Sequence, residues 1–280
     1  MLFYTEIAQD EKNGGEMLVL LSPSYEELSR EAARIVASAV RNNPAATLGL
    51  ATGSTTLGMY KELVRLHKEQ GLDFSKVVTF NLDEYLGLSA EHPQSFHCFM
   101  RENFFEHVNV KPENIHIPDG MIGGDYEKYC NSYERTIREA GGIDLQILGI
   151  GRNGHIGFNE PTSSFGSRTR LKVLTNETIE DNRKSFGAGE EMPECAITMG
   201  IGTILEAKKI LLLATGSSKA QTVAEAIEGP ITASVTASCL QLHADVTFVI
   251  DEAAGARLKQ REYYLRVMEM TARFTPNRLS

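Results

Sequence analysis

Short apolar runs alternate along this chain with longer segments in which apolar residues return every three or four positions. A continuous apolar run of four to eight residues is typical of a strand that is buried on both faces. Helical spacing of apolar residues instead predicts a helix that packs one face on the core. The strands expected in this way span Thr47–Ala51, Lys76–Phe80, Leu145–Ile150, Ile210–Ala214 and Val246–Ile250.

The first expected helix shows the local signals. Ser24 and Glu27 have the spacing of a capping box, in which two side chains satisfy amide groups at a helix start. Leu28, Ala32 and Val36 then recur on one helix face. Further helices are expected after the turn Thr52–Thr56, over Glu127–Ala140, over Lys219–Glu228 and within Ala254–Met270.

The alternation of strands and helices indicates βαβ units, and therefore an α/β fold built on an open, mostly parallel sheet. No Pro-rich or Ser-rich linker interrupts the pattern, so we expect a single domain over residues 1–280. Two stretches rich in glycine, proline and acidic residues, Glu113–Asp125 and Phe186–Glu194, are expected to be surface loops.

Composition narrows the class of protein and of partner. Hydrophobic residues make up 42% and charged residues 23% of the chain, which is ordinary for a soluble globular enzyme. The formal net charge of −9 argues against a nucleic-acid partner, because phosphate backbones require a basic surface. It leaves an anionic small molecule open as the ligand. No segment approaches the roughly 20 apolar residues needed to span a bilayer, so no membrane partner is expected.

The N-terminal segment and the cysteines bear on the cellular location. Residues 1–16 carry acidic residues early and no sustained apolar run, unlike a signal peptide. The four cysteines lie far apart without a CxxC pair, which favours reduced thiols in a cytoplasmic protein over a zinc site or a disulfide framework. They are Cys98, Cys130, Cys195 and Cys239.

The segment GIGRNGHIGFNEP, from Gly149 to Pro161, directly follows an expected strand. In open parallel sheets, ligands bind at the carboxyl ends of the strands. His155 both gives and takes protons near neutral pH, and Glu160 close behind it could orient the ring or tune its charge. A turn-forming loop with an incidental histidine is the alternative. The density of glycines after a strand favours a site.

Two nearly identical hexapeptides, Leu50–Thr55 and Leu213–Ser218, each follow an expected strand and precede an expected helix. In such a turn, exposed N–H groups and the positive end of the helix dipole attract an anion. Ser54 and Thr55 add hydroxyl donors, and Lys219 would add a positive charge. A pair of ordinary helix caps is the alternative, but two such loops favour a phosphate-sized ligand. Neither loop has the GxxxxGK[ST] or GxGxxG pattern, so nucleotides are weak candidates.

Two adjacent acidic residues, Asp83 and Glu84, follow another expected strand in the segment FNLDEY. Neighbouring side chains of an extended chain point to opposite faces, so only one of the two can enter a given pocket. A carboxylate and a histidine together can move protons next to a carbonyl group. The histidines between residues 92 and 116 show no HxxxH or HxH spacing, so no metal site is expected.

Together these segments resemble the glucosamine-6-phosphate deaminase family of aldose–ketose isomerase-deaminases, also called the glucosamine/galactosamine-6-phosphate isomerase family. The resemblance rests on LATGSTT, TFNLDEYLGL and GIGRNGHIGFNEP, with SRTRLKVLT and SCLQLH in support. It implies a single-domain, Rossmann-like parallel sheet with helices on both faces. It also implies an enzyme of amino-sugar metabolism that converts glucosamine 6-phosphate and water to fructose 6-phosphate and ammonia without a cofactor.

The resemblance further implies roles for individual residues. Asp83 would be the base that moves a proton between C2 and C1 of the open-chain sugar. His155 would open the pyranose ring by protonating O5 and accepting a proton from O1, while Glu160 would hold its tautomer and stabilise its charged form. The phosphate would lie on Gly53, Ser54, Thr55, Lys219 and Lys184, and the neighbouring Arg183 leaves the register at the last position open.

Position 153 departs from many members of the family, which have aspartate two residues before the histidine. Asn153 can orient His155 by hydrogen bonding, but it carries no negative charge that would favour the imidazolium form. We therefore expect ring opening to depend more heavily on Glu160. Some members are hexamers, which leaves a homo-oligomer open for this chain.

Two other functions compete with the deaminase. A 6-phosphogluconolactonase-like hydrolase has a related fold and a similar phosphate loop, but TFNLDEY together with GHIGFNEP favours the deaminase. A non-catalytic sugar-phosphate sensor would keep the phosphate loops, lose Asp83 or His155, and normally carry a helix-turn-helix module. This chain has both residues and neither the spare length nor the basic charge for such a module.

Overall fold

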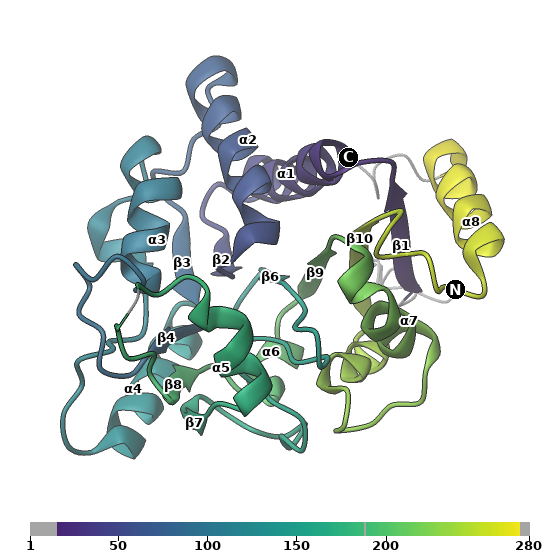
Figure 1. Cartoon of the computed structure of the whole chain (residues 1–280). Helices are drawn as coiled ribbons and strands as arrows, with labels where there is room; N and C mark the ends of the chain where they lie inside the picture. The colour runs from purple at the N-terminus through teal and green to yellow at the C-terminus, as the bar shows by residue number, and fades with distance from the viewer. Residues whose placement is uncertain (1–15, 188, 275–280) are drawn as a thin grey trace, which may run out of the picture.

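The computed structural model describes residues 16–187 and 189–274 (Figure 1). The expectation about the N-terminal segment therefore lies outside the described residues, as do both ends of the expected domain over residues 1–280. Among the described residues, none of the helices combines the length and the apolar character that crossing a membrane requires.

Seven strands form one sheet in which every neighbouring pair is parallel. They are β1 (Glu16–Ser22), β2 (Thr47–Leu50), β3 (Val78–Asn81), β5 (Ile115–His116), β6 (Leu145–Leu148), β9 (Lys209–Ala214) and β10 (Asp245–Asp251). Their order across the sheet is β1-β10-β9-β6-β2-β3-β5. The expected open parallel sheet is confirmed. The edge strands β1 and β5 were not among the expected strands.

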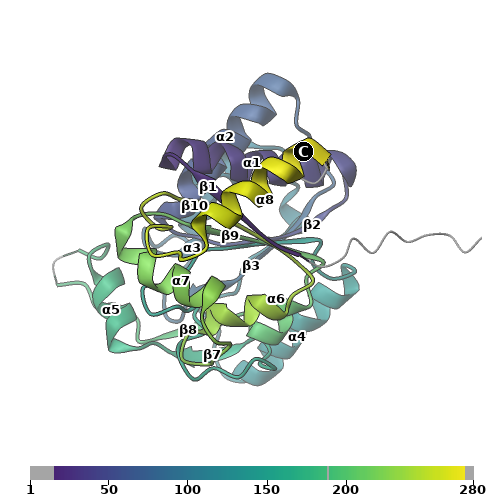
Figure 2. The ribbon, with the colours of Figure 1, turned by 90° about the vertical axis from the view of Figure 1, so that its right-hand side faces the viewer.

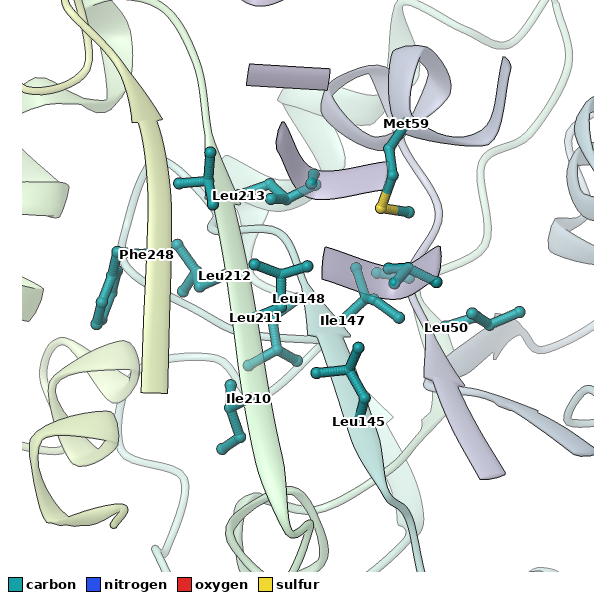
Figure 3. Close-up of a cluster of buried hydrophobic side chains, with 14 of the residues drawn as sticks. Leu50, Met59, Leu145, Ile147, Leu148, Ile210, Leu211, Leu212, Leu213 and Phe248 are labelled. Atoms are coloured by element: carbon teal, nitrogen blue, oxygen red, sulfur yellow. The ribbon is translucent and has the colours of Figure 1, made fainter. Parts of the chain in front are cut away.

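The two central strands β6 and β9 show why the apolar runs identified the sheet. All residues of β6 are buried, and in β9 only the first residue is exposed. Figure 3 shows Ile147 of β6 near Leu211 of β9, Leu212 on the side of β9 toward Phe248, and Met59 approaching from the helix that follows β2. Because helices cover both faces of these strands, nearly all of their buried side chains are apolar, and the buried Gln146 of β6 is the exception.

Helices lie on both faces of the main sheet, as expected. They are α1 (Tyr25–Asn42), α2 (Ser54–Gln70), α3 (Phe96–Asn103), α4 (Tyr126–Glu139), α5 (Asn176–Arg183), α6 (Ile201–Leu205), α7 (Ala220–Glu228) and α8 (Arg261–Phe274). Short 3₁₀ turns span Phe105–His107, Pro112–Asn114, Ser217–Lys219 and Thr236–Leu242. In Figure 2, α1, α2 and α8 lie above the sheet, and α4, α6 and α7 lie below it.

Helix α1 begins at the signal that the sequence carries. The hydroxyl of Ser24 accepts a hydrogen bond from the backbone N–H of Glu27 at 3.2 Å. The carboxylate of Glu27 turns toward Arg30, to which it lies at 2.5 Å, so only half of the expected capping box forms. Leu28 and Val36 of the expected apolar face are fully buried.

A second, three-stranded sheet was not expected from the sequence. It contains β4 (Asp83–Tyr85), β7 (Arg170–Val173) and β8 (Cys195–Thr198) in the order β4-β8-β7, with antiparallel pairing. Strands of three or four residues that include charged side chains carry almost no periodic signal. This small sheet matters because it fixes Asp83 in a strand rather than in a loop.

Two further expectations are corrected. The helix expected within Ala254–Met270 begins only at Arg261, because the amides of Lys259 and Gln260 donate to the carboxylate of Glu228 instead of to carbonyls of the preceding turn. The stretch Glu113–Asp125 is not wholly a loop, since it contains β5. In the other expected loop, Phe186–Glu194, the described residues form neither helix nor strand, as expected.

Candidate active site

The direction of strand addition reverses between β2 and β6. From β2 the chain proceeds across the sheet to β3 and β5, whereas from β6 it proceeds the other way to β9 and β10 (Figure 1). In open α/β sheets, ligands bind in the crevice outside the carboxyl ends of the strands at such a reversal. The candidate residues follow β2, β3, β6 and β9, so the topology brings all four segments to this edge.

The imidazole of His155 lies directly against the backbone of Gly151. A Cβ atom added to Gly151 would come within 2.4 Å of the ring, and the N–H of Gly151 donates to the carbonyl of His155 at 2.9 Å. The side chain of His155 is 18% exposed, so the ring remains open to a ligand on one side. A glycine is therefore required at position 151 for the loop to hold the ring in this place.

The carboxylate of Glu160 approaches the imidazole on the inner side. Oε2 of Glu160 lies 3.4 Å from Nδ1 of His155, close enough for an ion pair but without the orientation of a hydrogen bond. Asn153 donates from Nδ2 to the same oxygen at 2.9 Å and accepts the backbone N–H of His155 at 3.2 Å. Asn153 thus contacts Glu160 and the backbone of His155, not the ring itself.

The environment of Glu160 keeps its carboxylate charged. Burial by itself would raise its pKa, but His155 and the hydrogen bonds of Thr178 and Asn153 outweigh burial and lower the pKa to about 2. The N–H of Thr175 adds a further donor at 3.3 Å. A buried negative charge therefore lies beside the ring of His155.

Asp83 reaches the same crevice from β4. It pairs with Thr198 of β8 and is 6% exposed. A Cβ atom added to Gly157 would lie 3.4 Å from Oδ2 of Asp83, and Gly157 has the positive φ of 54° that favours glycine. The segment that carries His155 therefore meets the side chain of Asp83 at Gly157. Burial, with the charge of Glu84 adding to it, raises the pKa of Asp83 to about 8.

The first glycine loop presents unused donors at the start of α2. Gly53 is the N-cap residue with a φ of 119°, and no side chain caps the helix. Among the described residues, no hydrogen bond uses the N–H of Gly53, Ser54 or Thr55. Tyr25 fixes the turn by donating to the carbonyl of Ser54 at 2.9 Å. The loop has the free N–H groups and the helix dipole that an anion requires.

The second glycine loop differs from the first despite its similar sequence. The carboxylate of Asp251, at the end of β10, accepts from the hydroxyl of Thr215, from the N–H of Gly216 at 2.9 Å and from the N–H of Ala254 at 2.7 Å. The amide of Gly216 is thereby used within the protein, and a negative charge lies beside the loop. The anion therefore fits the first loop better than the second.

Lys219 follows the second loop and is partly buried. Burial lowers the pKa of Lys219, and the positive charge of Arg152 acts in the same direction. The acidic residues Asp181 and Glu177 of α5 act in the opposite direction. Arg152 itself pairs with Asp181 at 2.8 Å. Lys219 therefore faces both α5 and the segment that carries His155.

Among the described residues, no hydrogen bond or ion pair joins Lys184 to the other expected site residues. It is exposed at the C-cap of α5, as is the neighbouring Arg183. Neither side chain takes part in an ion pair among the described residues. The choice between the two cations therefore stays open.

Sequence reasoning missed two contributors to this site. Thr198 accepts the N–H of Phe158 at 3.0 Å and faces Gly157, so it joins β8 to the segment carrying His155. Asp251 takes up the amide of Gly216 in the second glycine loop. Asp251 comes directly after an expected strand, as the identified residues do, and no other feature of the sequence pointed to it. Glu84 was identified as the acidic neighbour of Asp83, but its partners at the start of α3 were not expected. Among the described residues, no cluster of three or more His, Cys, Asp or Glu side chains could hold a metal ion.

Comparison with known proteins agrees with this geometry. The sequence pattern of the family described as "Glucosamine-6-phosphate isomerases/6-phosphogluconolactonase" matches residues 23–248. A glucosamine-6-phosphate deaminase from Thermoanaerobacter pseudethanolicus is 53% identical over 246 residues, which cover 88% of this chain and 97% of that protein. One from Hahella chejuensis is 51% identical over 257 residues, which cover 92% of this chain and 98% of the relative.

Solved structures show the same relationship. The structure of a monomeric glucosamine-6-phosphate deaminase matches with a TM-score of 0.84 and 47% identity, covering 86% of this chain and all of that one. A 6-phosphogluconolactonase from Trypanosoma brucei matches with a TM-score of 0.67 and 18% identity, covering 87% of this chain and 99% of that one. At that identity the second likeness concerns the fold alone.

Proposed function

The chain belongs to the family of glucosamine-6-phosphate isomerases and 6-phosphogluconolactonases, among its glucosamine-6-phosphate deaminases, and on this premise we propose how its residues convert glucosamine 6-phosphate and water to fructose 6-phosphate and ammonia. The reaction needs a bound phosphate, an opened sugar ring, a proton transfer between C2 and C1, and hydrolysis of the resulting imine. The crevice at the carboxyl ends of β2, β3, β6 and β9 offers a group for each of the first three needs.

His155 opens the sugar ring in this proposal. The protonated imidazole donates to the ring oxygen O5 and afterwards accepts the proton of the hydroxyl on C1, so that the aldehyde forms. Glu160 supports this role, because its buried, ionised carboxylate lies 3.4 Å from Nδ1, where it can pair with the ring while the ring holds a proton. Asn153 keeps that carboxylate in place through its hydrogen bond of 2.9 Å.

Asp83 carries out the isomerisation. Its carboxylate removes the proton from C2 of the open-chain amino sugar and delivers a proton to C1, which turns the aldose amine into a ketose imine. Water then adds to C2 of the imine, and the C–N bond breaks to release ammonia and leave the ketone of fructose 6-phosphate. Burial supports the role of Asp83 as a base, since a pKa of about 8 makes the carboxylate a stronger proton acceptor than an exposed one.

The phosphate binds at the first glycine loop. The unused N–H groups of Gly53, Ser54 and Thr55 at the start of α2 support this assignment, together with the hydroxyls of the latter two residues. Lys219 provides a positive charge from the second loop, and Lys184 provides another from the end of α5. These cations bind ground state and transition state alike, so they serve affinity more than turnover.

The observation that carries the proposal is the meeting of Asp83 with the segment of His155 at Gly157. The test is to incubate the purified protein with glucosamine 6-phosphate and to measure ammonia and fructose 6-phosphate. We expect the two products in equal amounts. Product release from 6-phosphogluconolactone instead would support the lactonase, and binding of the sugar phosphate without turnover would support the sensor.

We further propose that one domain, spanning residues 1–280, carries the whole activity in the cytoplasm. The main sheet joins β1 and β10 at one edge, so the first and last described strands pair within a single structure. The four cysteines are free thiols, as suits a reducing compartment. Because one solved relative is described as monomeric and family members also include hexamers, the number of subunits is a question for sedimentation measurements.

A further inference from the structure

The carboxylate of Glu84 is the neighbour of the proposed base and points away from it into the protein. Its side chain is fully buried. Oε1 accepts the N–H of Tyr85 at 2.8 Å and that of Phe96 at 3.1 Å, while Oε2 accepts the N–H of His97 at 3.1 Å and faces Nδ1 of the same ring at 3.0 Å. Four donors on one carboxylate make an unusually complete set for an acidic side chain.

Three of these donors belong to the start of α3. Ser95 is the N-cap residue of this helix and accepts the N–H of Cys98 at 3.0 Å. Glu84 accepts two of the other N–H groups in the first turn, which have no partner within the helix. A negative charge is also favoured at the positive end of a helix. Glu84 is therefore the connection that holds the three-residue strand β4 to a helix.

The opposite side of Glu84 is closely packed as well. A Cβ atom added to Gly120 would lie 3.2 Å from Cγ of Glu84 and 2.4 Å from the carbonyl oxygen of Tyr85. Within the described part of the chain, β4 pairs only with β8, which places Asp83 opposite Thr198. With β8 on one side and α3 on the other, β4 has little freedom to move Asp83 relative to Gly157.

We propose that Glu84 is a positioning residue for the reaction: by tying β4 to the start of α3, it holds the carboxylate of Asp83 against the segment that carries His155. This inference rests on the proposed role of Asp83 as the base. A misplacement of about 1 Å between a catalytic group and its substrate costs about 100-fold in rate, so a strand of three residues needs such a support.

The charge of Glu84 has a second effect on Asp83. After burial, it is the other cause that raises the pKa of Asp83. The further ionisable groups facing this place are Tyr85 on the same strand and Tyr133 on α4, and burial raises the pKa of both, so they remain neutral. His97 on α3 faces Glu84 on its far side. Among the described residues, Glu84 is thus the neighbour whose charge acts on Asp83.

The experiment compares Glu84→Gln with Ser95→Ala, which weakens the same helix start but does not touch β4. For Glu84→Gln we expect kcat to fall about tenfold or more, KM to change little, and the rise of kcat/KM with pH to move about one unit lower, since a negative charge near the base is lost. For Ser95→Ala we expect a melting temperature lower by a few degrees and an unchanged pH profile.

A wild-type kcat and pH profile for Glu84→Gln, with only a lower melting temperature, would reduce Glu84 to a helix cap and overturn the proposal. If Glu84→Gln does not fold, Glu84→Asp takes its place, because it keeps the charge but shortens the reach. A lower kcat with an unmoved pH profile is then expected, and a wild-type kcat would overturn the proposal. Asp83→Asn distinguishes a failure of the proposed function from a failure of this inference. If Asp83→Asn retains turnover, the assignment of the base fails, whatever Glu84 does.

Discussion

Asn153 donates a hydrogen bond from Nδ2 to Oε2 of Glu160 over 2.9 Å, and the same oxygen lies 3.4 Å from Nδ1 of His155. The amide therefore acts on the ring through the carboxylate. This arrangement explains how a neutral asparagine can serve at position 153. A neutral donor leaves the full negative charge on Glu160, whereas a second carboxylate at this distance would compete for the same proton.

The first prediction concerns Asn153→Asp. Two carboxylates at hydrogen-bond distance share a proton at low pH and repel each other once both are ionised, so the pKa of one of them is raised in the folded protein. A raised carboxyl pKa removes stability as the pH increases. We expect the melting temperature to fall below that of the wild type at pH 8 by several degrees more than at pH 5. Asn153→Ala is the control, with similar losses at both pH values, and equal losses for Asn153→Asp would contradict the argument.

The second prediction concerns the activity of Asp83. A base must be deprotonated, and burial raises the pKa of this carboxyl to about 8. We expect kcat/KM to increase with pH up to about 8 and to level off above it. Asp83→Asn should lower kcat by about 10²–10⁴-fold, with binding of a sugar phosphate preserved because the phosphate loop lies after another strand. Near-normal turnover of this variant in a steady-state assay would exclude the assignment.

The third prediction concerns the effect of the same carboxyl on stability. The pKa of Asp83 is about 8 in the folded protein and 3.8 as the ordinary value, so between these pH values the folded state holds a proton that the unfolded state releases. Stability therefore decreases as the pH rises from about 4 to 8. Asp83→Asn removes this dependence and should raise the melting temperature at pH 8 more than at pH 5. Calorimetry at both pH values tests it, and a variant destabilised equally at both would count against a buried, proton-holding Asp83.

The fourth prediction concerns Lys219. In the proposed function its ammonium binds the phosphate, which does not change during the reaction, so its removal would weaken ground state and transition state equally. We expect Lys219→Ala to raise KM about 10–100-fold and to leave kcat within a factor of about three. Lys219→Arg should recover much of the affinity. A loss confined to kcat would instead show that the lysine acts on the reacting atoms.

Much of the fold could be predicted from local patterns. The strands β2, β3, β6, β9 and β10 were found within two residues of their ends, because a strand covered on both faces carries few polar side chains and therefore remains a mostly apolar run. The glycine-rich segments after these strands were found for a related reason, since a turn at the end of a parallel strand requires backbone conformations that glycine adopts most easily.

Long-range contacts decided the rest of the candidate site. Nothing local distinguishes Gly53 from Gly216, yet Asp251, 35 residues beyond the second loop, takes up the amide of Gly216 and leaves the first loop as the better anion site. In the same way, Asp83 and Glu84 are adjacent acidic residues in the sequence, and their different surroundings follow only from the distant segments that each of them contacts. Asp83 meets Gly157, while Glu84 meets the start of α3. The burial pattern of a strand or helix can be predicted from neighbouring residues in the sequence. A hydrogen-bond partner from a distant segment depends on how whole elements pack, so only the tertiary structure determines it.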